Sequence, residues 1–282
     1  MSAQAIGVFD SGIGGLTVVR ELLHTVPHER LVYFGDTARV PYGSKSVETV
    51  QRYAKEDTEL LLSHDVKMIV IACNTVSAIA LNEVIEAAAG IPVIGMIEPC
   101  AKEAVTLSRG VIGIIGTEAT IASGAYEVAL AIEAKRQSKQ ITTYVAACPL
   151  FVPLAEEGWT DHAATELIAQ EYLSVLRESG VDTLILGCTH YPVLANIIQR
   201  VMGSSVTLIN SGAVAARKVE TMLDKHSMTN TTEPKHTILV SDVPRKFQRV
   251  GERFLGRALP EARQVVFKES WVVKREAIDP SE

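Results

Sequence analysis

Residues 65–75 (DVKMIVIACNT) and residues 180–190 (GVDTLILGCTH) share one pattern: an apolar run, a cysteine at its end, and two polar residues after it. Short apolar runs rich in β-branched residues are typical of strands buried on both faces of a parallel sheet. The cysteines, Cys73 and Cys188, fall where such a strand ends and a helix begins. The two stretches therefore predict equivalent strands, each with a thiol at its carboxyl end.

Two further pairs of stretches support an internal repeat. IGVFDS at 6–11 resembles IGIIGT at 112–117, and FGDTARVPY at 34–42 aligns with AACPLFVPL at 146–154, with the Val-Pro pairs in register. The three pairs occur in the same order and at a slowly growing offset. An ordered set of this kind indicates a duplicated α/β unit.

Strand-like and helix-like segments alternate along most of the chain. Apolar runs occur at 5–9, 31–34, 68–72, 92–97, 111–115, 142–147, 183–186, 206–209 and 237–240. Segments with apolar residues at helical spacing occur at 46–63, 77–89, 120–134, 161–179 and 193–201. This alternation predicts an α/β fold with parallel sheets, and the repeat divides it into two pseudo-symmetric α/β domains.

The repeat also predicts where a ligand binds. In open α/β sheets the ligand lies beyond the carboxyl ends of the strands. Two facing units would form a cleft between them, lined by both sets of strand ends. The aligned pairs all fall at such ends: Asp10 with Gly116, Asp36 with Cys148, and Cys73 with Cys188. We expect the active site in this cleft, with one thiol from each side.

Composition limits the possible partners and location. Of the 282 residues, 47% are hydrophobic and 21% charged, and the formal net charge is −6. An acidic chain without a basic block is not expected to bind nucleic acid or an anionic membrane. No apolar run approaches the roughly 18 residues of a membrane span, and the start has no leader-like pattern. The four cysteines lack metal or disulfide spacing. We expect a cytoplasmic protein with free thiols and no metal site.

Two thiols at strand-to-helix junctions are suited to acid–base chemistry. Backbone N–H groups and the helix dipole at such a junction stabilise negative charge, so we expect the pKa of Cys73 and Cys188 to be lowered toward neutrality. One thiolate can remove a proton from one face of a carbon acid while the other thiol protonates the opposite face. This inverts a stereocentre without a cofactor. A Cys–His–Asp hydrolase built on Cys188 and His190 is an alternative, but it leaves Cys73 without a role.

Six motifs carry a resemblance to a known family. VFDSGIGGLTV, YFGDTARVPYG, ACNTVSA, GTEATIASGAY, CPLFVPLAEEG and LILGCTHYP, in this order, resemble the glutamate racemases. The resemblance implies a cofactor-independent isomerase that interconverts L- and D-glutamate and supplies D-glutamate for peptidoglycan. It also implies a cytoplasmic homodimer of two-domain subunits. The first domain would be discontinuous, comprising 1–99 and 210–282, with the second at 100–209.

The resemblance also assigns roles to residues. It implies that Cys73 deprotonates D-glutamate and Cys188 deprotonates L-glutamate, assisted by Asp10 and His190 respectively. Asp36 and Glu156 match further acidic residues near the site. The implied substrate contacts are Asp10, Ser11, Pro41, Tyr42, Gly43, Asn74, Thr75, Thr117, Thr120, Thr189 and His190.

Several of these residues also have a structural interpretation. Asp10 or Ser11 could cap the following helix, and Asp36 could belong to a turn. Glu156 could lie on a solvated helix end, and the family register alone selects it over Glu157. Cys100 and Cys148 lack motif context and are interpreted as structural.

Other functions remain open from the sequence. An aspartate racemase or another member of the superfamily would keep the mechanism and change the substrate. A dinucleotide-dependent oxidoreductase is suggested by Gly12, Gly14 and Gly15, but the third glycine of that fingerprint falls on Thr17. We instead expect these glycines to let the backbone approach a small carboxylate, with Asp10 near the substrate ammonium or a thiol. A third class is a regulatory protein that inhibits a DNA topoisomerase, as some family members are reported to do; the acidic balance does not support it.

Overall fold

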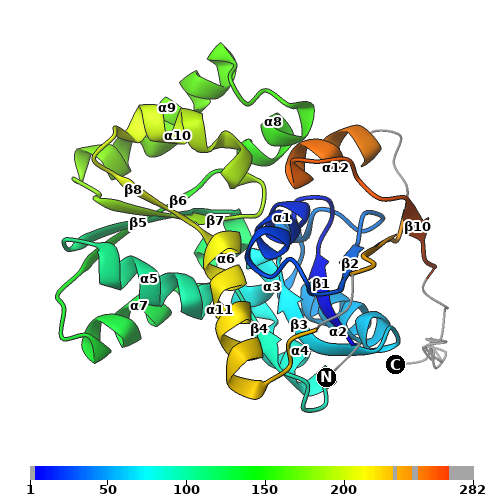
Figure 1. The fold of residues 1–282 in the computed structure, drawn as a ribbon. Helices are drawn as coiled ribbons and strands as arrows, with labels where there is room; N and C mark the ends of the chain where they lie inside the picture. Colours follow the sequence, from blue (N-terminus) through cyan, green and yellow to red (C-terminus); the bar gives the residue numbers. More distant parts are fainter. Residues whose placement is uncertain (1–3, 231–233, 243–246, 267–282) are drawn as a thin grey trace, which may run out of the picture.

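The protein contains two parallel β-sheets, each covered by helices (Figure 1). The computed structural model describes residues 4–230, 234–242 and 247–266. The six-stranded sheet has the order β10-β9-β2-β1-β3-β4, and the four-stranded sheet has the order β6-β5-β7-β8. All strand pairs in both sheets are parallel. The predicted fold class, two α/β domains with parallel sheets, is confirmed.

The strands of the six-stranded sheet are β1 (Ala5–Asp10), β2 (Leu31–Gly35), β3 (Val66–Ile71), β4 (Val93–Ile94), β9 (Thr237–Val240) and β10 (Ala262–Gln264). Those of the four-stranded sheet are β5 (Val111–Gly116), β6 (Thr142–Ala147), β7 (Thr183–Gly187) and β8 (Thr207–Asn210). The α-helices are α1 (Leu16–Thr25), α2 (Val47–Leu62), α3 (Asn74–Ile79), α4 (Leu81–Ala87), α5 (Ile97–Leu107), α6 (Glu118–Ala122), α7 (Ala125–Arg136), α8 (Phe151–Glu157), α9 (Ala163–Glu178), α10 (Ala195–Met202), α11 (Ser211–His226) and α12 (Phe247–Leu255). Short 3₁₀ helices cover Tyr42–Ser44 and Tyr191–Leu194.

The internal repeat predicted from the sequence corresponds to a repeated strand order. The order β2-β1-β3-β4 in one sheet recurs as β6-β5-β7-β8 in the other. The aligned glycines Gly7 and Gly113 lie in the equivalent strands β1 and β5. A Cβ on Gly7 would contact Leu61 of α2, and one on Gly113 would contact Leu176 of α9. A strand glycine thus lets the covering helix approach the sheet at the same place in both units.

The structure differs from the sequence expectations at several element ends. The segment 77–89 is two helices, α3 and α4, which meet at Ala80, and α3 begins earlier, at Asn74. The segment 120–134 is broken at Gly124, whose φ of 66° ends the helical path. Within 92–97, strand pairing is limited to Val93–Ile94, because Ile97 already begins α5. The strand β10 escapes sequence-based prediction because it is short, half-exposed and polar.

The C-terminal part of the described chain contributes to the six-stranded sheet. Strand β8 ends the four-stranded sheet at Asn210, and the next helix, α11, packs on α1 and α5. Strands β9 and β10 then join β2 at the edge of the first sheet. The exact division at 99 and 210 stays a prediction, and its last part, 267–282, lies outside the described residues. No helix in the described ranges is long and apolar enough to cross a membrane.

The close packing at Gly113 leads to a stability prediction. A Cβ there would lie 2.8 Å from Leu176 Cδ2 and 2.9 Å from Leu184 Cδ1, whereas at Gly7 the nearest atom is 3.1 Å away. Overpacking a tight interior typically costs about 1–3 kcal/mol. We expect G113A to lower the free energy of unfolding by about 1–2 kcal/mol and G7A to lower it less, as measured by urea denaturation. Equal stability of G113A and the wild type would contradict this packing.

Candidate active site

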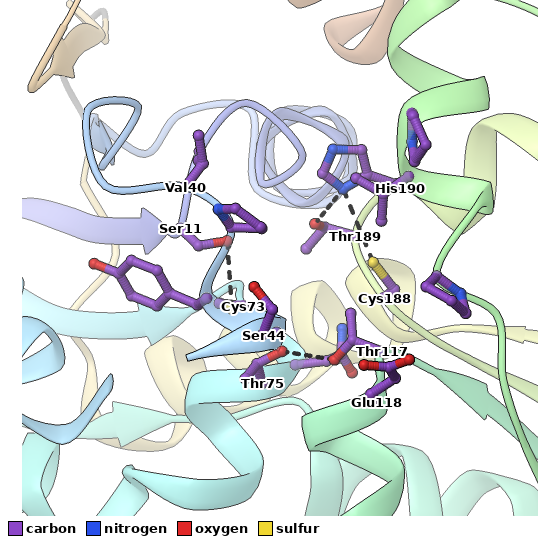
Figure 2. Close-up of a pocket in the computed structure, with 18 of the residues that line it drawn as sticks. Ser11, Val40, Ser44, Cys73, Thr75, Thr117, Glu118, Cys188, Thr189 and His190 are labelled. Carbon is purple, nitrogen blue, oxygen red and sulfur yellow. Dashed lines mark hydrogen bonds between the residues drawn. The ribbon is translucent and has the colours of Figure 1, made fainter. Parts of the chain in front are cut away.

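A pocket of about 220 Å³ lies between the carboxyl ends of the two sheets. Ser11, Cys73 and Thr75 line it from the six-stranded unit, and Thr117, Cys188 and His190 line it from the four-stranded unit. In Figure 2 the two cysteines lie on different walls of the pocket, and the side chains of both units point into the space between them. The repeat therefore brings together the two thiols that the sequence singled out.

Cys73 is the residue that precedes α3, and its thiol is buried. Its Sγ lies 3.8 Å from the Oγ of Ser11, to which the thiol donates (Figure 2). Burial, followed by the negative charge of Asp10, raises the pKa of Cys73 to about 12. The expectation of a lowered pKa is therefore wrong for Cys73. The helix α3 has only six residues, so its N-terminal N–H groups do not offset the loss of solvent.

Cys188 directly follows β7 and has a different environment. Its Sγ lies 3.9 Å from Nδ1 of His190 (Figure 2), and Nε2 of His190 lies 3.0 Å from Oε1 of Glu156. Burial disfavours the charged imidazole, but hydrogen bonds to Cys188 and Glu156 outweigh it and raise the pKa of His190 to about 10. At neutral pH the imidazolium thus lies beside the second thiol, between it and a carboxylate.

Asp10 ends β1 and lies behind the glycine-rich loop, outside the residues that line the pocket. Its Oδ2 accepts hydrogen bonds from the backbone N–H groups of Gly12 (3.1 Å) and Gly15 (2.9 Å), and its Oδ1 has no hydrogen-bond partner among the described residues. Burial raises the pKa of Asp10, against the charge of His190 and the N–H groups of the loop. Asp10 therefore closes the loop at the start of α1, while Ser11 reaches the thiol.

The loop glycines leave room for other parts of the protein. A Cβ on Gly14 would lie 2.3 Å from Oγ1 of Thr189 and 2.5 Å from Nδ1 of His190. A Cβ on Gly12 would lie 2.7 Å from Val40. Thr17 also donates a hydrogen bond of 2.8 Å to the carbonyl of Thr189. At Gly14 the missing side chain lets the second unit pack against the loop. The expected approach of this loop to a small carboxylate stays a prediction.

Asp36 is fully buried in a polar network beside the pocket. It accepts hydrogen bonds from Nε of Arg39 (2.5 Å), from the hydroxyl of Ser241 (2.7 Å) and from the hydroxyl of Tyr42. The Tyr42 oxygen also lies 3.0 Å from Oδ2 of Asp57, and burial, followed by the charge of Asp36, raises the pKa of Asp57 well above its ordinary value. The Tyr42 hydroxyl thus lies between the carboxyl groups of Asp36 and Asp57, and Arg39 contacts both of them. The structure thus places Asp36 where it fixes the pocket wall at Tyr42.

Hydroxyl and amide groups connect the two units at the base of the pocket. Oγ1 of Thr75 lies 3.0 Å from Oγ1 of Thr117 and 3.2 Å from Oγ1 of Thr120 (the first contact is drawn in Figure 2). The hydroxyl of Tyr126 donates to Oδ1 of Asn74 over 2.6 Å. These contacts join α3 of one unit to α6 and α7 of the other. They fix the helix that begins after Cys73 relative to the second unit.

The structure gathers most of the residues expected from the sequence. The pocket is lined by Ser11, Pro41, Tyr42, Gly43, Cys73, Asn74, Thr75, Thr117, Glu156, Cys188, Thr189 and His190. Asp10, Asp36 and Thr120 do not line it; each contacts a residue that does. Glu156, selected over Glu157, does contact His190. Cys100 and Cys148 are buried free cysteines that do not line the pocket. The chemical roles of these residues stay predictions.

Gly12, one of the loop glycines expected near a carboxylate, also lines the pocket. Other lining residues were not assigned to the site from the sequence: Ile13, Val40, Ser44, Glu118, Pro149, Val152, Pro153 and Gly187. The aligned Val-Pro pairs were a usable signal, because Val40–Pro41 and Val152–Pro153 line the pocket from the two units by the same symmetry as the thiols. In the described part of the chain, no group of three or more His, Cys, Asp or Glu residues could hold a metal ion.

The fold and site together define a class: a two-unit α/β protein whose shared cleft receives one thiol from each unit. Residues 6–219 match the Asp/Glu/Hydantoin racemase family, and the chain belongs to that family. It is 49% identical over 267 residues to the glutamate racemase of Chlorobaculum tepidum and 50% identical over 268 residues to that of Geobacter metallireducens. Each match covers 94% of this chain and 97% of the relative.

A solved structure is similar over nearly the whole chain. The glutamate racemase of Francisella tularensis, crystallised with D-glutamate, is 41% identical and has a TM-score of 0.86. The match covers 93% of this chain and 97% of that one. The family resemblance seen in the six sequence motifs is thereby confirmed.

The contact at Gly14 gives a second prediction. A Cβ there would displace Thr189 and His190, so we expect G14A to lower the free energy of unfolding by about 1–3 kcal/mol. We also expect iodoacetamide to alkylate Cys188 several times faster in G14A than in the wild type, as measured by peptide mass spectrometry. G95A is the control, because a Cβ on Gly95 would make only contacts of 3.4 Å or longer. Unchanged alkylation of Cys188 in G14A would refute the role of this glycine.

The raised pKa of His190 predicts a pH-dependent stability. Its pKa is about 10 in the folded chain, against about 6.5 when unfolded. The folded state therefore binds an extra proton between these values, and the contribution is complete below about pH 6.5 and lost as the pH rises through about 10. We expect the stability advantage of the wild type over H190N to shrink across this window in urea denaturation. A constant difference would contradict the raised pKa.

Proposed function

We propose that this chain interconverts L- and D-glutamate by a two-base mechanism in which Cys73 and Cys188 act from opposite walls of the pocket. The observation that carries the proposal is the pair of thiols, one from each repeated unit, at equivalent strand ends of one cleft. The high identity to proteins named glutamate racemase supports glutamate over aspartate as the substrate.

On the first wall, Cys73 would remove the α-proton of D-glutamate. An α-proton of an amino acid is very weakly acidic, so a strongly basic thiolate is required. The burial that raises the pKa of Cys73 to about 12 supplies such a base, and the ammonium of an entering substrate would lower that pKa by charge attraction. Ser11 accepts the hydrogen bond of the thiol and so holds the sulfur in place at the pocket wall.

On the second wall, Cys188 would remove the α-proton of L-glutamate and would protonate the carbanion in the reverse direction. The imidazolium of His190 lies beside its sulfur, and Glu156 holds that imidazole from its other nitrogen. The two thiols are thus activated differently. Substrate charge would lower the pKa of Cys73, whereas Cys188 has His190 beside it before any substrate enters.

The substrate carboxylates would be bound by neutral groups. No lysine or arginine is among the described residues that line the pocket. The available donors are the hydroxyls of Thr75, Thr117 and Thr189, the amide of Asn74 and backbone N–H groups at the start of α3. Fixed dipoles of this kind stabilise the charge that develops on the α-carboxylate during deprotonation. Asp10 would act indirectly, by holding the glycine-rich loop, and Asp36 would act indirectly, by holding Tyr42.

The wider biological setting rests on the resemblance. We propose that the reaction needs no cofactor, that its D-glutamate product supplies peptidoglycan synthesis, and that the chain works as a homodimer in the cytoplasm. A nicotinamide dinucleotide has no comparable support, because the loop glycines pack against Val40, Thr189 and His190 of the protein itself.

Replacement of either thiol tests the mechanism. We expect C73S and C188S each to lower racemisation of glutamate by about 10²–10⁴-fold, the usual contribution of a positioned acid or base. The assay follows the circular dichroism of L-glutamate without added cofactor, with L-aspartate as the comparison substrate. C100A, which alters a buried cysteine outside the pocket, is the control and should retain activity. Full activity in either serine variant, or no reaction of the wild type with glutamate, refutes the proposal.

A further inference from the structure

The helix α12 connects the two units at the second thiol. It lies in the chain between β9 and β10 of the six-stranded sheet and packs on α1 of the same unit. Its last turn nevertheless lies against α8, which belongs to the other unit (Figure 1). The residues at this contact are Arg253 and Phe254. Neither lines the pocket, and the mechanism above assigns neither a role.

Arg253 caps the end of the helix that carries Glu156. Its Nη1 donates to the carbonyl oxygens of Glu156 (3.2 Å) and Ala155 (3.5 Å), which belong to the last turn of α8. Carbonyls of a last turn lack partners within their own helix. The cap residue Gly158 has a φ of 79°, and a Cβ there would lie 2.4 Å from Cζ of Arg253. The guanidinium therefore covers the C-terminus of α8, where a positive charge is favourable.

Phe254 makes the second contact, with His190 itself. Its side chain is fully buried, and its ring packs edge-to-face on the imidazole with centroids 5.2 Å apart at 88°. His190 is thus held by Glu156 at Nε2, by the thiol of Cys188 near Nδ1 and by Phe254 against the ring. A buried ring packed in this way has little freedom to rotate.

From these contacts we propose that Arg253 and Phe254 are positioning residues that hold the Glu156–His190 pair in place at Cys188. The proposal rests on the proposed function for its catalytic meaning, but the contacts themselves are independent of the substrate. In this arrangement α12 of the first unit supplies the side chains that order the acid–base group of the second unit.

The charges around His190 allow a test based on the direction in which its pKa changes. Its titratable neighbours are Glu156 on α8, Cys188 after β7 and Asp10 at the end of β1, with Arg253 behind Glu156. Removing the positive charge of Arg253 would by itself raise the pKa of His190. Losing the ordered Glu156 contact would lower it. A fall in this pKa upon loss of Arg253 therefore reports lost positioning.

The experiment is an NMR titration of the ¹⁵N-labelled imidazole of His190 in the full chain. We expect R253M to lower the pKa of His190 from about 10 by about one unit or more, with E156Q as the positive control. R249M is the matched control, because it removes a charge from an exposed position one turn earlier in α12 and should leave the pKa unchanged. A pKa at or above the wild-type value in R253M overturns the proposal.

A double-mutant cycle tests whether Arg253 acts through Glu156. If it does, R253M should cause no further fall in the pKa when E156Q is already present. F254L, which keeps an apolar side chain but loses the aromatic edge, gives an independent arm in case R253M fails to fold. We expect F254L to broaden or shift the His190 resonances. We also expect it to lower the apparent pKa of the alkaline limb in the pH profile of kcat/KM. Unchanged resonances in F254L, or an additive fall in the double variant, would count against the proposal.

These readouts separate the proposal from the racemase assignment. A wild-type chain that does not racemise glutamate would overturn the proposed function, while the NMR titration would still establish or refute the positioning of His190.

Discussion

The contact between the loop at Gly14 and the Thr189–His190 pair determines how the two sheets meet. Without a side chain at Gly14, the second unit packs directly on the loop that follows β1, and Thr17 bonds to the carbonyl of Thr189. This approach places the strand ends that carry Cys73 and Cys188 on the walls of one pocket. The threonine hydroxyls and the Asn74–Tyr126 bond extend the same interface beneath it. The site therefore depends on how closely two backbones can approach.

The scaffold is symmetric, but the chemistry built on it is not. Cys73 and Cys188 occupy equivalent strand ends, yet the first is desolvated beside Asp10 and the second lies against an imidazole with a pKa raised to about 10. Asp10 aligns with Gly116, and Asp36 aligns with Cys148, so neither acidic residue has a counterpart in the other unit. A racemase must deprotonate both enantiomers at the same carbon. Two bases in different environments can do this, one for each enantiomer.

Electrostatics in the pocket follow from burial more than from helix dipoles. The sequence-based expectation weighed the N-terminus of α3 and neglected desolvation, which is the larger effect for a thiol that is 5% exposed. Burial likewise raises the pKa of Asp57, whose carboxyl group contacts the same Tyr42 hydroxyl as Asp36. These buried polar groups hold the pocket wall in place, because moving one of them would break its hydrogen bonds to the others.

The sequence by itself determined the parallel α/β class, the duplication and the residues at strand ends, because apolar runs, glycines and the repeat are local patterns. It also identified most of the pocket, including the choice of Glu156 over Glu157 through the family register. Tertiary structure alone decided that Asp10 and Asp36 lie behind the pocket wall, that Gly14 accommodates His190, and that α12 reaches Glu156. Those relations join residues far apart in the chain. Burial and contact distance, which set the roles of these residues, exist only once the two units have packed together.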